Sequence, residues 1–415
     1  MKRLTLEVFP LSKITVLGGC GAIGTWATRT VAGGDFFDEV VVAENRLEAA
    51  CELAEKLGPK VRAVEVDAND PETIKKVIKG SRVVLNCIGP YYRYGPPIMK
   101  AVIESGIDYV DVCDDLDATE TMLDMDQAAK DAGVGALIGM GNSPGLANVL
   151  ARYCSESLLD ETDSVDIYHI HGGEPGEGGA VIKHRIHAMT NDIPLFIDGK
   201  FVQVRMLDED GLAFAEDTEF KDVGVYKVYP YPHPETITLP KHIAGIKRVT
   251  NMGTVLPTNY FDFTMDTVRV GMATLDPIQV EGCDVVPLEF EVSFILSRRA
   301  ELLAAAGVTG PSGCLKVTVK GRKDGEVHTY IFSMSSTGAG AGEGTGIPGA
   351  IGAILMSQGK IPQRGVFPPE AAVSPAEVMA IAAVAVKGTG VGDKVPISVE
   401  HIDAAGKKEN VDFAL

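Results

Sequence analysis

The order of apolar and polar residues changes character about one third of the way along this 415-residue chain. Up to about residue 140, short apolar runs rich in Val and Ile alternate with stretches in which apolar residues recur every three or four positions. The first pattern is typical of strands buried on both faces, and the second is typical of amphipathic helices. We therefore expect strands in residues 13–18, 39–44, 61–68, 81–88, 107–113 and 134–139, with helices between them.

Beyond about residue 160 the chain consists mainly of short runs in which apolar and polar residues alternate, separated by Gly, Pro and Asp turns. We expect strands in residues 165–173, 198–206, 287–296, 313–322 and 327–336. Alternation of this kind indicates half-buried strands, so a mostly antiparallel sheet is predicted. A further apolar stretch, residues 350–359, predicts a helix.

These patterns predict an α/β protein with a doubly wound Rossmann dinucleotide-binding domain and a second α+β domain built on a mostly antiparallel sheet. We expect the first domain in residues 1–141 and a substrate-binding and dimerisation domain in residues 142–345. Residues 346–415 form a C-terminal segment whose helix we expect to pack back on the first domain.

A glycine-rich turn joins the first expected strand to the first expected helix. Gly19, Gly21 and Gly24 have the spacing G-x-G-x-x-G, which is a weak signal alone but gains weight between a strand and a helix. The three glycines would permit the tight turn, the close approach of a pyrophosphate and the close packing of helix on strand. Backbone N–H groups at the helix start, those of Ala22 and Ile23 included, would then bind the phosphates.

Glu44 follows Gly24 by 20 residues and ends the second expected strand. A carboxylate there accepts hydrogen bonds from the ribose hydroxyls and repels a 2′-phosphate, so we expect NAD as the cofactor. Arg46 keeps NADP open, because a guanidinium could stack on the adenine or bind that phosphate. The other expected cofactor contacts follow the second, third and fourth strands and are Asn45, Asp67, Ala68, Cys87, Ile88, Gly89 and Pro90.

Polar residues just after the later strands are candidates for the chemistry. Arg93 could hold a substrate carboxylate through two parallel hydrogen bonds, or it could be a surface arginine. Asp114 could pair with a substrate ammonium and accept its proton, although either Asp114 or Asp115 could instead cap the next helix. Asn142, in the turn N-S-P-G, could contact the substrate or only shape the turn.

The histidines offer a third group of candidates. His184 and His187 lie three residues apart and would share one face of a helix, as functional or as partly buried structural residues. His169 and His171 would share one face of a strand, but no third ligand has a suitable spacing, so we expect no metal. The catalytic candidates are thus Asp114, Arg93 and His184, and the substrate-binding candidates are Tyr94, Asn142 and His187.

Composition narrows the range of partners. The formal net charge of −19, with no concentrated basic face, argues against nucleic acid and anionic membranes as main partners. Seven cysteines without C-x-x-C spacing indicate neither a disulfide framework nor a zinc site. No signal peptide and no membrane span of about 18 apolar residues is evident. We expect a cytoplasmic protein with a small-molecule substrate.

Several longer segments carry a resemblance to a known family: residues 86–115, 141–151 (G-N-S-P-G-L-A-N-V-L-A), 172–179 and 345–370, which include R-G-V-F-P-P-E. Together with the glycine turn they resemble the saccharopine dehydrogenase-like family over nearly the whole chain. Within it, the layout resembles the L-lysine 6-dehydrogenase and saccharopine reductase branches. The sequence departs from that pattern at Asn142 and Ser143, in the Pro-rich residues 229–242 and in the Gly-rich residues 338–344.

The resemblance implies a two-domain NAD(P)-dependent oxidoreductase that acts at a C–N bond of an amino acid or polyamine, and we expect a homodimer. Two alternatives stay open: an NAD(P)-dependent enoyl or carbonyl reductase on the same scaffold, and a non-catalytic NAD(P)-binding sensor. Polar residues at three strand ends, Arg93, Asp114 and Asn142, count against the sensor, because a sensor needs no polar floor for a substrate.

Overall fold

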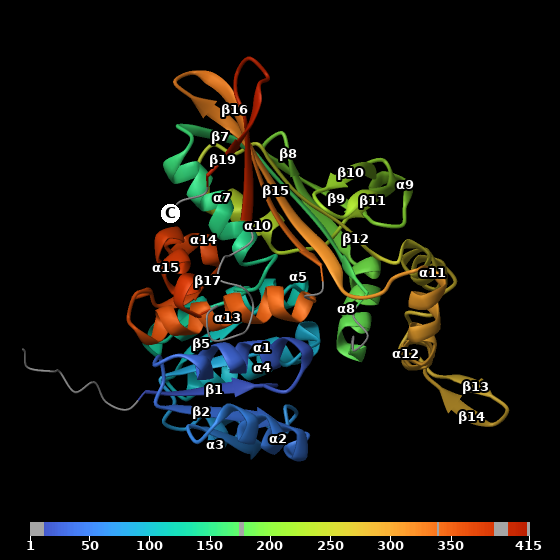
Figure 1. The fold of residues 1–415 in the computed structure, drawn as a ribbon. Helices are drawn as coiled ribbons and strands as arrows, with labels where there is room; N and C mark the ends of the chain where they lie inside the picture. Colours follow the sequence, from blue (N-terminus) through green and yellow to red (C-terminus); the bar gives the residue numbers. More distant parts are fainter. Residues whose placement is uncertain (1–11, 174–177, 338–339, 386–396, 413–415) are drawn as a thin grey trace, which may run out of the picture.

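The computed structural model describes residues 12–173, 178–337, 340–385 and 397–412. Its first sheet is parallel and has the strand order β17-β6-β5-β4-β1-β2-β3 (Figure 1). The strands are β1 (Lys13–Leu17), β2 (Glu39–Glu44), β3 (Val61–Glu65), β4 (Val83–Asn86), β5 (Asp108–Asp111), β6 (Gly135–Leu137) and β17 (Gly365–Phe367). Strand order reverses between β1 and β4, and ligands of such sheets bind beyond the carboxyl ends of the strands there.

Helices cover both faces of this sheet. One face carries α1 (Ala22–Gly33), α2 (Leu47–Leu57), α13 (Ala341–Ser357) and α15 (Pro375–Ala385), and the other carries α3 (Pro71–Ile78), α4 (Tyr91–Glu104), α5 (Leu116–Leu123) and α6 (Asp126–Asp131). Asp70 caps α3 through a hydrogen bond from the Glu72 N–H, and Pro71 is the first helical residue. The predicted doubly wound α/β fold is confirmed.

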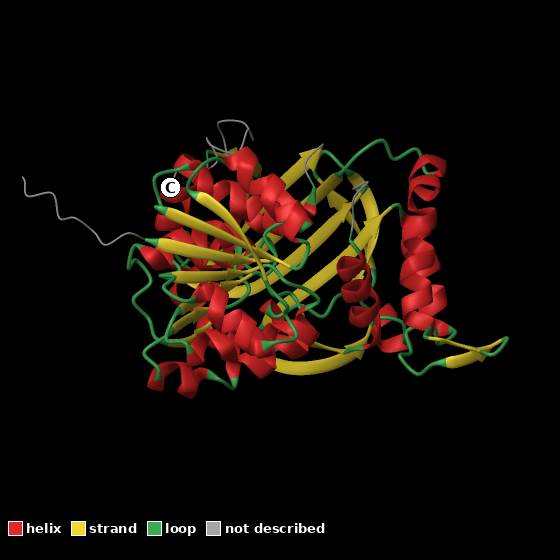
Figure 2. Ribbon diagram, turned by 90° about the horizontal axis from the view of Figure 1, so that it is seen from below, coloured by secondary structure: helices red, strands yellow, loops and turns green. Residues whose placement is uncertain are grey.

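The second sheet has the order β10-β11-β12-β7-β15-β16-β18-β19, with β8 and β9 attached beside β12. Its strands are β7 (Glu161–Gly172), β8 (Asp192–Ile197), β9 (Lys200–Arg205), β10 (Glu216–Phe220), β11 (Gly224–Pro230), β12 (Arg248–Leu256), β15 (Ser312–Lys323), β16 (Glu326–Thr337), β18 (Ile397–Ile402) and β19 (Lys408–Val411). Only β12 and β7 pair in parallel among these described strands, so the predicted mostly antiparallel sheet is confirmed. Figure 2 shows the sheet as a curved layer beside the first.

Two groups of helices accompany this sheet. The helices α7 (Leu146–Ser157) and α10 (Glu235–His242) pack with β7, β15 and β16, whereas α8 (Gly179–Thr190), α11 (Thr258–Arg269) and α12 (Pro287–Ala305) form a separate apolar cluster with β8. The short helices α9 (Glu209–Leu212) and α14 (Pro369–Ala372) and the hairpin β13 (Ile278–Val280) with β14 (Cys283–Val285) complete the described elements. Helices α11 and α12 and the hairpin project as an arm (Figure 1).

The expected strand at 287–296 is wrong, because these residues begin the helix α12. Leu288, Val292 and Ile295 are buried at helical spacing, while Phe290 and Phe294 lie exposed on another side. The apolar residues at 288, 290, 292 and 294 alternate like those of a strand, but they belong to two sides of one helix. Alternation alone could not separate the two cases.

The Gly-rich residues around 342–352 form the helix α13, which crosses α1. A Cβ at Gly342 would lie 2.5 Å from Ala22 O, and one at Gly346 would lie 2.4 Å from Ile23 O. Glycine is therefore needed for the two helices to approach at the glycine-rich turn. Residues 338–339 of the Gly-rich segment lie outside the described residues, as do 174–177. No helix among the described residues is long and apolar enough to cross a membrane.

Candidate active site

The glycine-rich turn lies between β1 and α1, at the carboxyl edge of the first sheet. A Cβ at Gly24 would lie 2.0 Å from Gly18 O, so a side chain there would prevent this close packing of helix on strand. A Cβ at Gly21 would meet only Gly18 O, at 3.5 Å, so the space beside it is open. No described side chain caps the start of α1, which leaves its first N–H groups available to an anion. This geometry fits the pyrophosphate of a dinucleotide.

Glu44 lies beside this turn, as the sequence spacing indicated. Its Oε2 accepts a hydrogen bond from the Cys20 N–H at 3.2 Å, and its Oε1 accepts one from the Asn45 N–H at 3.1 Å. The Arg46 guanidinium is 3.9 Å from the same carboxylate, and its side chain is 63% exposed. A carboxylate suited to a ribose and a cation suited to a 2′-phosphate are thus at the same strand end.

The remaining cofactor candidates follow β3 and β4. Asp67 accepts two hydrogen bonds from Asn69, each 2.9 Å long, and they lower the pKa of Asp67. Burial, with a smaller effect of the Asp111 carboxylate, raises the pKa of the Cys87 thiol to about 12. The thiol is therefore neutral and fills space. Ala68 and Ile88 pack against the core of the first sheet, while Gly89 and Pro90 connect β4 to α4.

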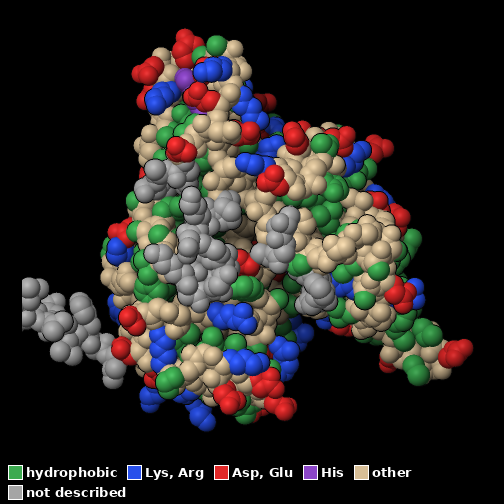
Figure 3. Space-filling view, viewed as in Figure 1, with side chains coloured by type: hydrophobic (Ala, Val, Ile, Leu, Met, Phe, Trp, Pro, Cys, Tyr) green, Lys and Arg blue, Asp and Glu red, His purple; other side chains and the backbone are tan. Residues whose placement is uncertain are grey.

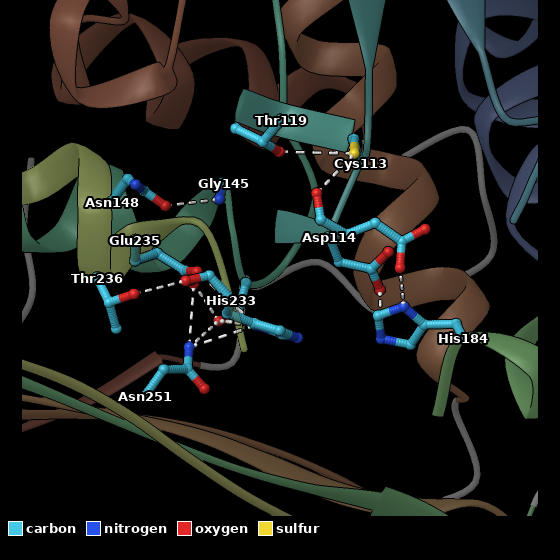
Figure 4. Close-up of polar contacts among 12 residues, drawn as sticks. Cys113, Asp114, Thr119, Gly145, Asn148, His184, His233, Glu235, Thr236 and Asn251 are labelled. Atoms are coloured by element: carbon cyan, nitrogen blue, oxygen red, sulfur yellow. Dashed lines mark hydrogen bonds and ion pairs between the residues drawn. The ribbon is translucent and has the colours of Figure 1, made fainter. Parts of the chain in front are cut away.

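Two aspartates that follow β5 face a histidine of α8 (Figure 4). His184 Nδ1 is 2.7 Å from Asp115 Oδ1, and its Nε2 is 3.5 Å from Asp114 Oδ2. Asp115 is 2% exposed and also accepts a hydrogen bond from the Tyr92 N–H at 2.9 Å. Asp115 occupies the position before α5 without capping it by its side chain. It fixes the His184 ring, whereas the Asp114 side chain is 36% exposed and open to a substrate.

The charges of this group follow from its burial and its ion pairs. Burial alone would lower the pKa of His184, but the carboxylates of Asp114 and Asp115 outweigh it and raise that pKa to about 9. Burial raises the pKa of Asp114 to about 6 despite His184, whereas for Asp115 the attraction to His184 outweighs burial and lowers the pKa. At neutral pH the His184 imidazolium therefore lies between two carboxylates. A group of this kind can bind a cationic substrate and exchange a proton with it.

A second polar cluster faces the first across the same space (Figure 4). It contains Ser143, which follows β6, and Asn251 in β12, together with His233 just before α10 and Glu235 at the first position of α10. Ser143 Oγ is hydrogen-bonded to Glu235 Oε1 and lies 3.4 Å from His233 Nδ1. Burial raises the pKa of Glu235 to about 8, partly offset by the Ser143 bond, and lowers the pKa of His233 well below its ordinary value. This cluster is uncharged at neutral pH.

Sequence reasoning did not select His233, Glu235 or Asn251. The only signal was indirect: Ser143 and the Pro-rich residues 229–242 depart from the family pattern. His169, considered for a metal pair, stacks on His233 with ring centroids 5.0 Å apart, and burial lowers its pKa to about 3. His169 therefore contributes a neutral wall to the second cluster.

The structure brings some predicted residues together and separates others. His187 Nε2 is 3.0 Å from Asp117, and its ring centroid is 4.1 Å from that of Tyr92. The Arg93 guanidinium lies over the Tyr94 ring and reaches Asn69 Oδ1 at 3.5 Å, and it has no ion pair among the described residues. Arg93 is thus turned towards the end of β3 rather than towards Asp114. The half-buried Asn142 accepts the Ala147 N–H through its backbone oxygen.

Two groups of side chains have the spacing of metal ligands. The described part of the chain brings ligand-type atoms within 4.8 Å of one another in the set Asp114, His184 and His233 and in the set Asp115, Asp117 and His187. Both His184 nitrogens meet carboxylates, and His187 meets Asp117. Carboxylates therefore already contact both His184 and His187 in these sets.

Comparison with known proteins gives matches at three levels. Residues 14–137 match the family model of the saccharopine dehydrogenase NADP binding domain. Carboxyaminopropylagmatine dehydrogenase of Synechocystis sp. is 27% identical over 378 residues, 86% of this chain and 92% of that protein. Carboxynorspermidine synthase of Vibrio alginolyticus is 25% identical, with 83% and 84% covered. Apo saccharopine dehydrogenase (L-Glu forming) of Saccharomyces cerevisiae is 18% identical with a TM-score of 0.65, covering 96% of this chain and 100% of that one.

These matches confirm the resemblance inferred from the sequence and the use of NAD(P). The domain model covers the first sheet, and the two relatives and the yeast structure extend the likeness across both sheets. The open space at Gly21 and the carboxylate of Glu44 lie at the carboxyl edge of the first sheet, where ligands of doubly wound sheets bind. The chain is therefore an NAD(P)-dependent oxidoreductase that is similar to saccharopine dehydrogenase-like proteins.

Proposed function

We propose that this oxidoreductase transfers hydride at a C–N bond of an amino-acid-like or polyamine substrate, oxidising an amine or reducing the corresponding imine. The observation that carries the proposal is the His184 imidazolium held between Asp114 and Asp115 at the carboxyl end of β5. Such a group binds an ammonium and exchanges its proton, as amine chemistry requires. A substrate whose carbon–carbon double bond is reduced offers no ammonium group at the reacting carbon for this site to bind.

Two further observations support an amine substrate. The relatives that match most of the chain are named as a carboxyaminopropylagmatine dehydrogenase and a carboxynorspermidine synthase, after polyamine-related compounds. The formal net charge of −19 favours the approach of a cationic molecule over that of an anion.

Each residue of the site then has a definite part. When NAD(P) is bound, its nicotinamide accepts or gives the hydride. Asp114 pairs with the substrate ammonium and takes its proton, the His184 imidazolium lies beside the Asp114 carboxylate, and Asp115 fixes the imidazole ring. Tyr94, Asn142 and His187 contact the rest of the substrate. We propose that Arg93 holds a substrate carboxylate after turning away from Asn69.

We also propose finer features of the enzyme. NAD is preferred over NADP, because the Glu44 carboxylate lies beside the phosphate turn. The protein acts in the cytoplasm. Its division is that expected from the sequence: a cofactor domain in residues 1–141, a substrate and dimerisation domain in 142–345 and a C-terminal segment in 346–415.

We propose that two copies of the chain associate through the arm formed by α11, α12 and the hairpin β13–β14. Phe290, Phe294, Ile278 and Val280 are each about half exposed on it, and apolar side chains gather at its end (Figure 3). Together with Leu275 and Val270 they offer on the order of 500 Å² of apolar surface, a large part of the roughly 800 Å² per partner of a standard interface. An exposed apolar patch of this size marks an interaction surface, and a second copy of the same chain is always available to bind it.

Sedimentation velocity tests the dimer. Phe294→Asp places a charge on the exposed side of α12 and should convert the dimer to a monomer. Val225→Asp is the control, because Val225 is 64% exposed and lies in β11, outside the arm. A monomeric wild-type protein would contradict the dimer.

The function is tested by a substrate screen. Amino acids and polyamines, with and without carboxyalkyl groups on nitrogen, are assayed for NADH or NADPH formation near pH 9, and carbonyl compounds plus amines are assayed for its consumption at pH 7. We expect turnover of at least one secondary or primary amine. Turnover of enoyl or simple carbonyl compounds alone would favour a reductase of those groups, and cofactor binding without any turnover would favour a sensor.

A further inference from the structure

We propose that Glu235, Ser143 and His233 form a proton relay that ends at His233 Nε2, and that the relay serves the water molecule added or released at the substrate carbon. The inference rests on the proposed C–N chemistry. It adds a second path for protons, separate from the pair of His184 and Asp114.

The three side chains are connected in series (Figure 4). Ser143 Oγ is hydrogen-bonded to Glu235 Oε1 and lies 3.4 Å from His233 Nδ1. Asn251 Nδ2 is 3.2 Å from Ser143 Oγ and 3.3 Å from both His233 Nδ1 and Glu235 Oε1. The two N–H groups of this amide therefore lie against all three groups, two of which they can bond at one time, and keep them close enough for proton transfer along hydrogen bonds.

The far end of the relay faces the first cluster. One ligand-type atom of each of His233, His184 and Asp114 lies within 4.8 Å of the other two, and the two histidine rings are 6.2 Å apart. Because His233 Nδ1 is turned to Ser143, the nitrogen on the open side is Nε2. Two histidines held by carboxyl groups thus face one space from opposite sides.

Glu235 is difficult to explain as a structural residue. It is fully buried, its Oε2 has no hydrogen bond among the described residues, and the nearest histidine nitrogen is 3.7 Å away. A buried carboxyl with an unpaired oxygen opposes folding, so its presence here calls for a role other than stability. The titratable groups around the relay are His169 and His171 of β7, His184 of α8, Asp114 after β5, Tyr231 before α10 and Glu370 of α14.

The relay has two neutral-ring states. With a proton on Glu235, its O–H donates to Ser143, the Ser143 O–H donates to His233 Nδ1, and an Nε2–H faces the substrate. Without that proton the bonds reverse, and Nε2 presents a lone pair. Burial raises the pKa of Glu235 to about 8 and keeps His233 uncharged, so the two states exchange near that pH.

The proton balance defines the step. In the oxidative direction R₂CH–NH₂⁺–R′ gives one proton to the Asp114–His184 pair and a hydride to NAD(P)⁺, leaving R₂C=NH⁺–R′. Water adds to the carbon while one of its protons passes to Nε2, the Nδ1 proton passes to Ser143, and the Ser143 proton passes to Glu235. The proton on the Asp114–His184 pair returns to nitrogen, the C–N bond breaks, and R₂C=O and R′NH₃⁺ leave. The relay then runs back from Glu235 through Ser143 to His233, and Nε2 releases one proton to solvent. In the reverse direction, the Nε2 proton converts the departing hydroxide into water.

Rapid kinetics test the order of these events. Ser143→Ala and Glu235→Gln should lower steady-state amine oxidation about 100-fold. The rate at which NAD(P)H forms in the first turnover, measured by absorbance in a stopped-flow instrument, should stay within about twofold of the wild-type rate. Hydride transfer precedes the relay, so loss of the relay should not slow it. The wild-type steady-state rate should rise with pH through about 8, and Glu235→Gln should lose that rise.

Two further variants serve as controls. Ser143→Thr keeps the hydroxyl and should restore most of the steady-state rate. Thr236→Val removes a neighbouring hydroxyl whose one hydrogen bond within the described part of the chain is to the His233 backbone oxygen, at 2.9 Å, and should change neither phase. Equal losses in the first turnover and the steady state, or an unchanged Ser143→Ala variant, would overturn the relay.

A spectroscopic measurement tests the relay in the absence of substrate turnover. In protein with ¹⁵N-labelled histidine, the His233 nitrogens should exchange protonation between Nε2 and Nδ1 with a midpoint near pH 8, while the ring stays neutral. Glu235→Gln should abolish this exchange. A His233 spectrum that is identical in both proteins would overturn the relay, whereas absence of amine turnover with the exchange intact would overturn only the proposed function.

Discussion

The cofactor end and the proton end of the site are built from different parts of the polypeptide. The cofactor end uses backbone groups of the turn at residues 18–24 and one carboxylate, Glu44, all within the first β–α–β unit. The proton end uses side chains from four places: after β5, after β6, in α8, and between β11 and β12. An added side chain should therefore disturb the cofactor end, whereas the loss of a side chain should disturb the proton end.

The two ends also differ in how they handle charge. At the cofactor end, backbone dipoles of α1 meet an anion, so no side chain must change its protonation. At the proton end, one histidine is charged beside carboxylates while the other is kept neutral by burial. Neighbouring groups whose pKa values are pushed apart in this way are suited to act as acid and base.

Removal of the His184 ring should have the largest effect. His184→Asn should lower kcat/KM for the amine about 1,000-fold, because proton exchange with the ammonium is lost. The Kd for NAD(P) should be unchanged, since His184 belongs to the proton end. Steady-state kinetics and calorimetry measure the two quantities, with His242→Asn at the exposed end of α10 as the control. Equal weakening of cofactor binding would show that the two ends are not separate.

The opposite result is expected for the phosphate turn. Gly21→Val should weaken NAD(P) binding at least about 100-fold, because its side chain occupies the open space that fits the pyrophosphate. Its melting midpoint should stay close to that of the wild type. Gly24→Ala should instead lower the melting midpoint, because its Cβ would lie 2.0 Å from Gly18 O. Normal cofactor affinity in Gly21→Val would move the binding site away from this turn.

The pH dependence of stability separates the neutral cluster from the charged one. The folded-state pKa of Glu235, about 8, lies above its unfolded value, so its contribution to stability is complete below about pH 4 and is lost as pH rises to 8. Glu235→Gln should therefore gain on the order of 2 kcal/mol relative to the wild type between pH 6 and 8. Chemical denaturation at both pH values measures this gain, and a constant difference would show that Glu235 does not titrate there.

The first sheet and the cofactor end could be predicted because their signals are local. The spacing of Gly19, Gly21 and Gly24 and the offset to Glu44 lie within one β–α–β unit, and the six strands have continuous apolar runs. The seventh strand, β17, was not predicted, because its three residues carry no such run and join the sheet from residue 365 onwards.

The proton end could be predicted only in part. Asp114 and His184 were selected separately, but their contact depends on how α8 approaches the end of β5, which sequence spacing does not specify. His233 and Glu235 lie in a Pro-rich segment whose position is set by the second sheet. The same absence of local information explains α12, where the exposed side that includes Phe290 and Phe294 imitates a strand.

The smallest expected effect concerns cofactor choice and tests whether one carboxylate governs the cofactor end. Wild-type protein should bind NAD at least about tenfold more tightly than NADP, because a carboxylate placed like that of Glu44, beside the phosphate turn, accepts hydrogen bonds from ribose hydroxyls and repels a 2′-phosphate. Glu44→Ala should reduce this ratio about tenfold and leave kcat with NAD nearly unchanged, whereas Glu39→Ala, at the start of β2, should leave the ratio as it is. Calorimetric titration with both cofactors gives the ratio. Equal dissociation constants for NAD and NADP in the wild type would show that Arg46, which is 3.9 Å from Glu44, binds the 2′-phosphate. Arg46→Ala should then weaken the binding of NADP but not that of NAD.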